Sequence, residues 1–412
     1  MRIIFLCGYF ESVYQTEIVQ KTKTWVENAA NTFQKRLLEG MIQQPSVSLK
    51  AISAPFIGAW PKSYRQVYFK EFKTKVSRHE LDIEYVRFNN VWGYRNISRM
   101  KSLKKALASM IEHQTTQEKV YLIVYSPHTP FLEAAVHVKK QRPNVHVHLI
   151  VPDLPQYMNL SDNKHYLYDF FKKIDIARFM KMNELVDSYT LLTNDMATRL
   201  HVADRPYHVV EGIVDCQPFA VSRKQKCVKT IAYAGKLQKI FGVQRLVEAF
   251  YMLKNSNIRL EICGGGELQE YIRWASEKDS RILYHGVVSA EQAKGIIQNA
   301  DVLVNPRIND SEYTKYSFPS KNLEYLMTGN AVVAYMLDGI PEIYRQFFFV
   351  PECEDIQALK QTLEQALYAT SVEIKEKYER AYAYISSHLT SVRVAEKIIT
   401  EMTTCHFTSG KG

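Results

Sequence analysis

Short apolar segments alternate with helix-length segments along most of this 412-residue chain, and this alternation limits the folds open to it. In the second half, apolar runs of strand length end near Ala234, Cys263 and Val304, with helical patterns between them. Parallel strands need a long crossover connection, which is usually a helix. The sequence therefore predicts an α/β fold with parallel sheets and crossover helices.

The expected elements fall into two sets. For the first half we predict strands at residues 3–7, 47–52, 120–125, 145–151, 191–193 and 209–212, and helices at 29–41, 130–140 and 196–200. For the second half we predict strands at 230–234, 259–263, 282–285, 302–304 and 331–335, and helices at 243–254, 267–277 and 290–298. Because the chain is too long for one typical core, we expect two Rossmann-like domains, residues 1–205 and 206–390. Residues 391–412 are expected to form a C-terminal helix that packs back toward the N-terminal domain, followed by a tail.

Positive charge is concentrated in the first half of the chain. Residues 1–205 contain 29 Lys and Arg against 19 Asp and Glu, whereas residues 206–412 contain 24 of each kind. The densest basic stretches, residues 62–78, 101–105 and 165–181, also carry aromatic or apolar side chains. Each stretch alone is typical of a solvated helix face with a buried stripe. Together they favour an anionic membrane surface over nucleic acid as a partner, because no nucleic-acid-binding module is recognisable.

The cysteines and the apolar runs bear on the compartment. Six widely separated cysteines show no paired metal-ligand spacing, so we expect a reducing compartment and no metal site. The first apolar run is too short for a secretion signal, and no run approaches bilayer length. These features predict a cytoplasmic protein whose basic half could bind the inner face of the cell membrane as a peripheral protein.

The segment KYSFPSKNLEYLMTGNAVV, residues 315–333, places a turn-prone loop directly before a helix. Pro319 and Ser320 suit a helix start, and such a start attracts anions because its first N–H groups are unpaired. Lys315 and Lys321 add positive charge, and Glu324 could accept hydrogen bonds from a ribose diol. An ordinary capped helix would contain the same residues.

Four loops of the second half follow predicted strands at one edge of the sheet, where open α/β sheets bind their ligands. One runs from Gly235 to Gly242 and one from Gly264 to Glu267; the others are His285 with Gly286, and the loop that contains Lys315. Each loop taken singly can be read as a turn. Four in register favour a site for a nucleotide diphosphate.

Residues 230–345 resemble the donor domain of retaining GT-B glycosyltransferases, and they are most similar to the bacterial family four enzymes that build surface polysaccharides. The resemblance rests on residues 233–236, 242–243, 264–267, 285–286, 300–306 and 315–333. It implies two Rossmann-like domains facing each other across a cleft, and transfer of a sugar with retention of anomeric configuration. It also implies a nucleotide-diphosphate sugar as donor, UDP- or GDP-linked, no metal or other cofactor, and a glycan or polyprenyl-diphosphate-linked acceptor.

The resemblance assigns roles to individual residues. Glu324 corresponds to the ribose-binding carboxylate, and Lys236, Lys239 and Asp153 are the other catalytic candidates. The donor-binding candidates are Gly235, Gly265, Gly266, His285, Lys315, Tyr316, Ser317, Phe318, Pro319, Ser320, Lys321 and Glu324. The acceptor-side candidates are Gly8, Tyr9, Asn28, His128 and Asp153, although Asp153 could equally cap a helix.

Two positions depart from the family pattern. Tyr316 stands where the family has the first of two glutamates, and Phe241 stands where a lysine usually precedes Gly242. Lys239 or Lys321 would then have to supply the missing cation. A nucleotide-sugar epimerase of the same fold and a non-catalytic partner subunit of a polysaccharide assembly complex are the alternative functions.

Overall fold

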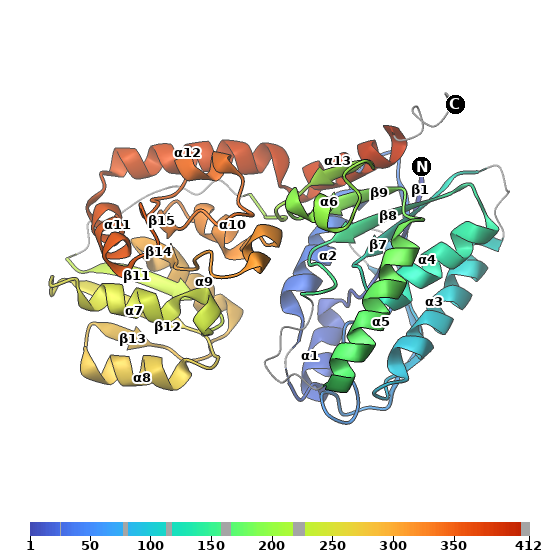
Figure 1. Ribbon diagram of the computed structural model, residues 1–412, viewed down its shortest axis with the longest axis horizontal. Coiled ribbons are helices and arrows are strands. Elements are labelled where there is room, and N and C mark those ends of the chain that lie inside the picture. The colour runs from blue at the N-terminus through green and yellow to red at the C-terminus, as the bar shows by residue number, and fades with distance from the viewer. Residues whose placement is uncertain (25, 77–80, 113–117, 158–165, 217–226, 405–412) are drawn as a thin grey trace. The chain divides into compact units, whose positions relative to one another are not determined.

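The computed structural model describes residues 1–24, 26–76, 81–112, 118–157, 166–216 and 227–404 (Figure 1). The chain divides into two compact units. Unit 1 consists of Met1–Ile213 together with the chain from Thr390 onward, and unit 2 is Val214–Leu389.

Unit 1 is built on one sheet with the strand order β10-β9-β8-β7-β1-β2-β5-β4. Neighbouring strands are parallel, except that β4 runs antiparallel to β5. The strands are β1 (Arg2–Cys7), β2 (Ser48–Ser53), β4 (Phe72–Val76), β5 (Leu81–Tyr85), β7 (Val120–Tyr125), β8 (Val145–Val151), β9 (Ser188–Leu191) and β10 (Tyr207–Val209). A separate antiparallel pair joins β3 (Tyr68–Phe69) and β6 (Phe88–Asn89). Every residue of β7 and β8 is buried, as expected for central parallel strands covered on both faces.

Helices connect and cover the strands of unit 1. They are α1 (Ser12–Lys21), α2 (Asn28–Ile42), α3 (Arg95–Glu112), α4 (Thr129–Gln141), α5 (Tyr166–Asn183), α6 (Asp195–Arg199) and α13 (Ser391–Thr404). Helix α4 packs between α3 and α5 (Figure 1). Helix α13 packs on α2, and Gly40 makes this approach possible, because a Cβ there would lie 1.9 Å from the carbonyl oxygen of Ser391.

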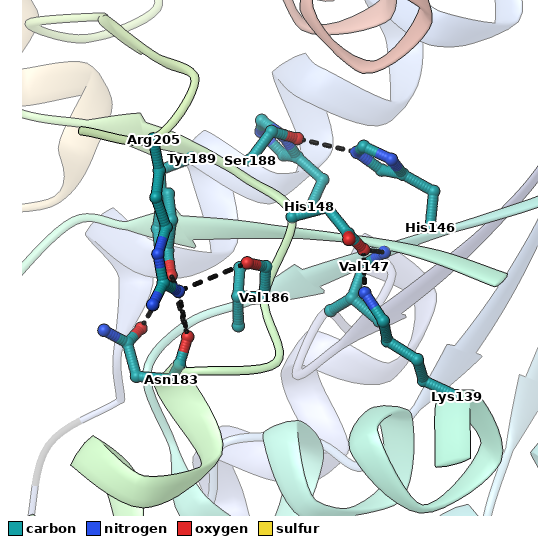
Figure 2. Close-up of polar contacts among 10 residues, drawn as sticks. Lys139, His146, Val147, His148, Asn183, Val186, Ser188, Tyr189 and Arg205 are labelled. Carbon is teal, nitrogen blue, oxygen red and sulfur yellow. Dashed lines mark hydrogen bonds and ion pairs between the residues drawn. The ribbon is translucent and has the colours of Figure 1, made fainter. Parts of the chain in front are cut away.

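A chain of polar side chains crosses β8, β9 and β10 of unit 1, and Figure 2 shows its part around His146, His148 and Ser188. His146 Nε2 and His148 Nδ1 each lie 2.8 Å from Ser188 Oγ. His148 Nε2 lies 2.8 Å from Thr190 Oγ1, which is 2.9 Å from His208 Nε2. These hydrogen bonds offset the cost of burying polar groups between parallel strands. Burial lowers the pKa of His208 to about 4, and burial also lowers the pKa of His148 well below its ordinary value.

Unit 2 is built on a fully parallel sheet with the order β13-β12-β11-β14-β15. Its strands are β11 (Lys229–Ala234), β12 (Ile258–Cys263), β13 (Ile282–Tyr284), β14 (Val302–Asn305) and β15 (Ala331–Ala334). Its helices are α7 (Val243–Tyr251), α8 (Gln269–Lys278), α9 (Ala290–Asn299), α10 (Ser320–Leu326), α11 (Ile356–Tyr368) and α12 (Ser371–His388). Short 3-10 turns cover Lys239–Phe241, Glu312–Tyr316 and Glu342–Gln346. Helix α7 contacts both α8 and α11, while α10 contacts α12 (Figure 1).

The structure contains elements that the sequence did not predict, among them α1, β5, α11 and α12, and it differs from the expectation in three further places. The described part of the basic stretch 62–78 forms β3 and β4 rather than a helix face, because its aromatic side chains pack beneath α1 and against β5. Strand β9 begins at Ser188, before the predicted strand at residues 191–193. Ser188 and Thr190 are polar, so the first part of the strand lacks the apolar run on which the prediction relied. Both side chains are hydrogen-bonded to the buried His148. Strand β10 pairs with β9, so unit 1 extends past residue 205 to Ile213.

Helix α13 belongs to unit 1, the unit that contains the N-terminus. Within the part of the chain that the structure describes, none of the helices combines the length and the apolarity needed to span a bilayer.

Candidate functional site

The strand order of unit 2 creates a switch point between β11 and β14. From β11 the chain winds outward through β12 to β13, and then returns to the other side of β11 as β14. In open α/β sheets this reversal leaves a crevice beyond the carboxyl ends of the two central strands, and ligands bind there. Gly235 follows β11 and Pro306-Arg307 follows β14, so these residues stand at the switch point.

Backbone hydrogen bonds join three of the predicted loops. Gly264 donates its N–H to the carbonyl oxygen of Gly286 at 2.7 Å, and Gly235 donates to that of Cys263 at 2.9 Å. Leu237 donates to the carbonyl oxygen of Gly265 at 2.9 Å. Gly235, Gly264 and Gly266 have φ values of 154°, 137° and 154°, which side-chain-bearing residues rarely adopt. The glycine-containing loops therefore form one continuous edge, and the glycines have no side chains that could cover it.

Lys321, the second residue of α10, extends over this edge. Its Nζ lies 3.1 Å from the hydroxyl of Tyr233 and 4.3 Å from the centroid of the Tyr233 ring. A Cβ on Gly235 would lie 1.6 Å from the same Nζ, so the lysine occupies the space that the glycine leaves free. No ion pair joins this Nζ to a carboxylate among the described residues. Burial lowers the pKa of Lys321 to about 8, although the charge of Glu324 opposes the shift.

Arg307 is a second cation at the switch point, and it was not identified from the sequence. Its guanidinium lies 5.7 Å from the centroid of the Phe241 ring and 5.1 Å from that of Tyr313. The side chain is buried, its Nε has no hydrogen-bond partner, and burial lowers its pKa. Lys321 Nζ lies 6.0 Å from the same Phe241 ring. Lys321 and Arg307 therefore both lie near Phe241, the position at which the family that this chain resembles has a lysine. The only sequence signal was a basic residue directly after a predicted strand.

The loop before α10 is largely buried. Tyr316 donates from its hydroxyl to Glu312 Oε1 at 3.1 Å, and the ring of Phe318 packs 5.0 Å from that of Tyr344. Ser317 is buried, and its Oγ has no hydrogen-bond partner. Pro319 is the N-cap residue of α10, and Ser320 is its first residue. The side chain of Ser317 is thus a donor and acceptor that no other described residue uses.

Other predicted residues of unit 2 point to solvent. Lys236, Lys239, Lys315 and Glu324 are exposed. Lys236 accepts a hydrogen bond from Tyr233 through its carbonyl oxygen at 2.8 Å, and the backbone N–H of Lys239 donates to Glu267 at 2.6 Å. Glu324 lies one helical turn from Lys321, and its carboxylate has no hydrogen-bond partner within the described part of the chain. It is therefore available for a ligand hydroxyl.

The backbone and the side chain of His285 make different contacts. Its N–H donates to the carbonyl oxygen of Ile262 at 2.9 Å, which keeps the chain at the sheet edge. Its ring Nε2 lies 3.0 Å from Glu261 Oε2 and lines a cavity of about 430 Å³ against α9. The side chain is thus already bonded to a carboxylate, and it does not lie with the Lys321 cluster.

In unit 1, Gly8 and His128 come together around Phe56. These positions follow β1 and β7, the central pair of that sheet. A Cβ on Gly8 would lie 2.5 Å from the Phe56 ring, which packs 5.9 Å from the ring of His128. His128 Nδ1 is buried without a partner, and burial with the charges of Arg99 and Arg95 lowers its pKa to about 3.

The remaining acceptor-side candidates are spread around this cluster. Tyr9 is buried, and its carbonyl oxygen accepts from Ser53 Oγ at 2.5 Å. Asn28 is exposed at the start of α2, and Asp153 is half-buried after β8. The charge of Asp153 helps to raise the pKa of Tyr125. Among the described residues no three His, Cys, Asp or Glu side chains gather closely enough to hold a metal ion, and the absence of a metal stays a prediction.

Comparisons with known proteins agree with this geometry. Residues 228–368 match the family described as glycosyl transferases group 1. No curated protein sequence matches the chain. Among solved structures, sucrose-phosphate synthase from Thermosynechococcus elongatus is similar over 100% of both chains, with a TM-score of 0.64 and 11% identity.

Two further structures contain uridine nucleotides. A structure described as trehalose-6-phosphate from E. coli bound with UDP-2-fluoro glucose is similar over 98% of this chain and 99% of that chain, with a TM-score of 0.63 and 10% identity. S. aureus TarM, solved with UDP, is similar over 77% of this chain and 59% of that chain, with a TM-score of 0.53 and 13% identity. The predicted fold is confirmed: the chain has the GT-B fold with two Rossmann-like domains, and residues 228–368 match the glycosyl transferases group 1 model.

Proposed function

We propose that the protein is a retaining, metal-independent glycosyltransferase that moves a sugar from a nucleotide-diphosphate sugar to a glycan or lipid-linked acceptor. The observation that carries the proposal is Lys321, a cation at the switch point of unit 2 whose Nζ contacts a tyrosine and no carboxylate. A diphosphate would supply the missing negative charge. The group 1 domain match and the UDP-containing structural neighbours support the same class of donor.

The site offers what a departing nucleotide diphosphate requires. When the bond between the anomeric carbon and the diphosphate oxygen breaks, negative charge develops on the phosphate and positive charge on the sugar ring. Cations already in place stabilise that phosphate without rearranging during the reaction. Lys321 and Arg307 would do this, and the glycine edge lets the phosphates approach the backbone. The free carboxylate of Glu324 would hold the ribose hydroxyls.

Retention follows if the acceptor attacks the face that the diphosphate leaves. The acceptor oxygen then forms the new bond to the anomeric carbon, and its proton passes to the departing phosphate oxygen. No nucleophile from the protein is needed. Stabilisation of the departing diphosphate would therefore depend on the cations of unit 2. Tyr316 is hydrogen-bonded to Glu312, so other residues would have to recognise the donor sugar.

We further propose a role in bacterial surface polysaccharide biosynthesis, at the inner face of the membrane. Helix α5 supports the membrane part, because Phe170, Phe171 and Ile174 are 54%, 63% and 42% exposed. Lys172 and Lys173 adjoin them in the sequence, so apolar and basic groups occur together, as in surfaces that bind anionic lipids. Vesicle flotation tests this part: binding should require anionic lipid, and equal binding to neutral vesicles would contradict it.

The donor site is tested by thermal unfolding with UDP-, GDP-, ADP- and TDP-sugars. A ligand that binds only the folded protein raises the unfolding temperature, so the nucleotide that responds identifies the donor. Lys321→Ala should lose the response, whereas Lys278→Ala, at the exposed end of α8, should retain it. If no nucleotide sugar stabilises the wild-type chain, the proposal is wrong. A changed sugar epimer, seen by NMR without an acceptor, would favour the epimerase instead.

A further inference from the structure

A cavity of about 310 Å³ opens in unit 1, beside the carboxyl ends of β1 and β5. Its walls come from Phe10, which follows β1, from α1 between Tyr14 and Lys21, from the segment between Tyr64 and Phe72, and from Tyr85 at the end of β5. The volume is at the lower end of the range for small-molecule sites. None of the residues assigned above to the acceptor side lines it.

Half of the residues that line the cavity are aromatic. Phe72 stacks on Tyr85 with centroids 4.2 Å apart, and Tyr14 lies 4.5 Å from Phe72 on the other side. Phe69 packs 6.1 Å from Phe72. Tyr85 is buried, whereas Tyr14, Phe69 and Phe72 are each partly exposed. The cavity therefore presents flat apolar rings that the protein does not itself cover.

The cavity also has a polar rim without net charge. Glu17, Gln66, Lys70 and Glu71 are exposed around it, and Lys21 is paired with Glu17. Two carboxylates balance two ammonium groups, so the cavity does not select for a phosphate or another anion. Carboxylates and an amide at the edge of flat rings suit a ligand with hydroxyl groups around an apolar face.

A buried carboxylate adjoins the wall of this cavity. Glu11 is 9% exposed, and no described residue forms a hydrogen bond with its Oε1. Its backbone N–H donates to the hydroxyl of Tyr85 at 3.3 Å, and its carbonyl oxygen accepts from the N–H of Tyr14 at 3.0 Å. An unpartnered buried acceptor is costly, and a ligand hydroxyl that reached it would remove that cost.

We propose that this aromatic pocket binds a neutral pyranose ring, the sugar end of the acceptor. The C–H face of a pyranose packs on an aromatic ring, and its equatorial hydroxyl groups reach the polar rim. The identification of the ligand as the acceptor rests on the proposed glycosyltransferase function, whereas the binding of a sugar ring does not. A lipid chain would leave the charged rim without a role.

Saturation-transfer NMR on the full chain tests the proposal with methyl glucosides, galactosides, mannosides and N-acetylglucosaminides as probes. The ring C–H protons of at least one glycoside should receive saturation from the wild-type protein. Phe72→Leu and Tyr14→Leu remove a flat face while keeping apolar volume, and each should weaken binding about tenfold. Phe72→Tyr keeps the ring and should bind like wild type, as should Trp274→Leu in unit 2.

Two results would overturn the proposal. One is the absence of saturation transfer to any of these glycosides, or transfer that Phe72→Leu and Tyr14→Leu leave unchanged. The other is binding of farnesyl phosphate in place of glycosides, which would make the pocket a lipid site. The thermal response to nucleotide sugars should persist in Phe72→Leu. Its absence from the wild type would contradict the donor proposal alone, so the two failures can be distinguished.

Discussion

The carbonyl oxygen of Gly235 lies 1.7 Å from the point at which a Cβ on Gly264 would stand, so the loops after β11 and β12 fit together only without a side chain there. The contact is between backbone groups, which cannot rotate away as the end of a side chain can. The edge of the candidate donor site is thus set by the absence of one methyl group.

Gly264→Ala is expected to destabilise unit 2 by several kcal/mol, because the new methyl group overlaps backbone and the φ of 137° is unfavourable for alanine. Urea unfolding would measure the loss. Gly295→Ala is the matched control, since it lies in α9 with nothing within 4 Å of its Cβ. That variant should gain roughly 0.5–1 kcal/mol from helix propensity. Equal stability of both variants would contradict the packing described here.

Nucleotide-sugar binding is expected to weaken as pH rises above about 8, the value to which burial lowers the pKa of Lys321. A diphosphate binds the protonated lysine, so its presence raises the pKa of Lys321. Between the free and bound pKa values the dissociation constant should rise up to tenfold for each pH unit. Titration calorimetry across pH 7–10 would record this slope. Lys321→Arg should remove the dependence if it still binds, because arginine stays charged over this range.

Acid should destabilise unit 1 through its buried histidines. The folded pKa of His208 is about 4, below the 6.5 of an exposed histidine, so the unfolded chain binds more protons between these values. Stability is therefore fully present above pH 6.5 and is lost as pH falls toward 4. Chemical unfolding at pH 4.5, 5.5 and 7 would show the slope. Substituting His208→Gln, which keeps a polar partner for Thr190 Oγ1, should reduce it. An unchanged slope would assign the acid sensitivity to other groups.

Gly40→Ala is expected to separate α13 from α2, because its Cβ would lie 1.9 Å from the carbonyl oxygen of Ser391. The backbone of one helix must then move, which should cost several kcal/mol and expose apolar residues of α13 such as Val394 and Ile398. Hydrogen exchange in α13 would report the change directly. Protection in α13 equal to that of the wild type would show that the helices adapt without separating.

The fold could be predicted from the sequence because buried parallel strands appear in it as continuous apolar runs. Strands β1, β7 and β8 needed only their own residues to be recognised, since both of their faces are covered. Strands β3 and β4 were missed, because exposed basic residues alternate there with aromatics that pack around Tyr85. Helix α1 was missed because only Ile18 of its ten residues is buried, which leaves little apolar periodicity. Propensity cannot show that such residues line a cavity.

The candidate site was predicted in part, and those residues remain predictions. Glycines after strands could be found from the sequence because their position at the sheet edge follows from strand order. That Lys321 lies over Gly235, and that Arg307 shares Phe241 with it, depends on side chains brought together by folding. The hydrogen bond between His285 and Glu261 likewise joins neighbouring strands, and no local sequence pattern predicts it.

Unit 1 contains the first 213 residues and also α13, so unit 2 is an insertion within it. During synthesis from the N-terminus, the strands of unit 1 emerge long before the helix that packs on α2 and near β10. Unit 2 must be made, and can fold, while its host is still unfinished. A chain that lacked α13 would therefore leave uncovered the face of α2 against which this helix packs, and that face would become accessible to proteases and chaperones.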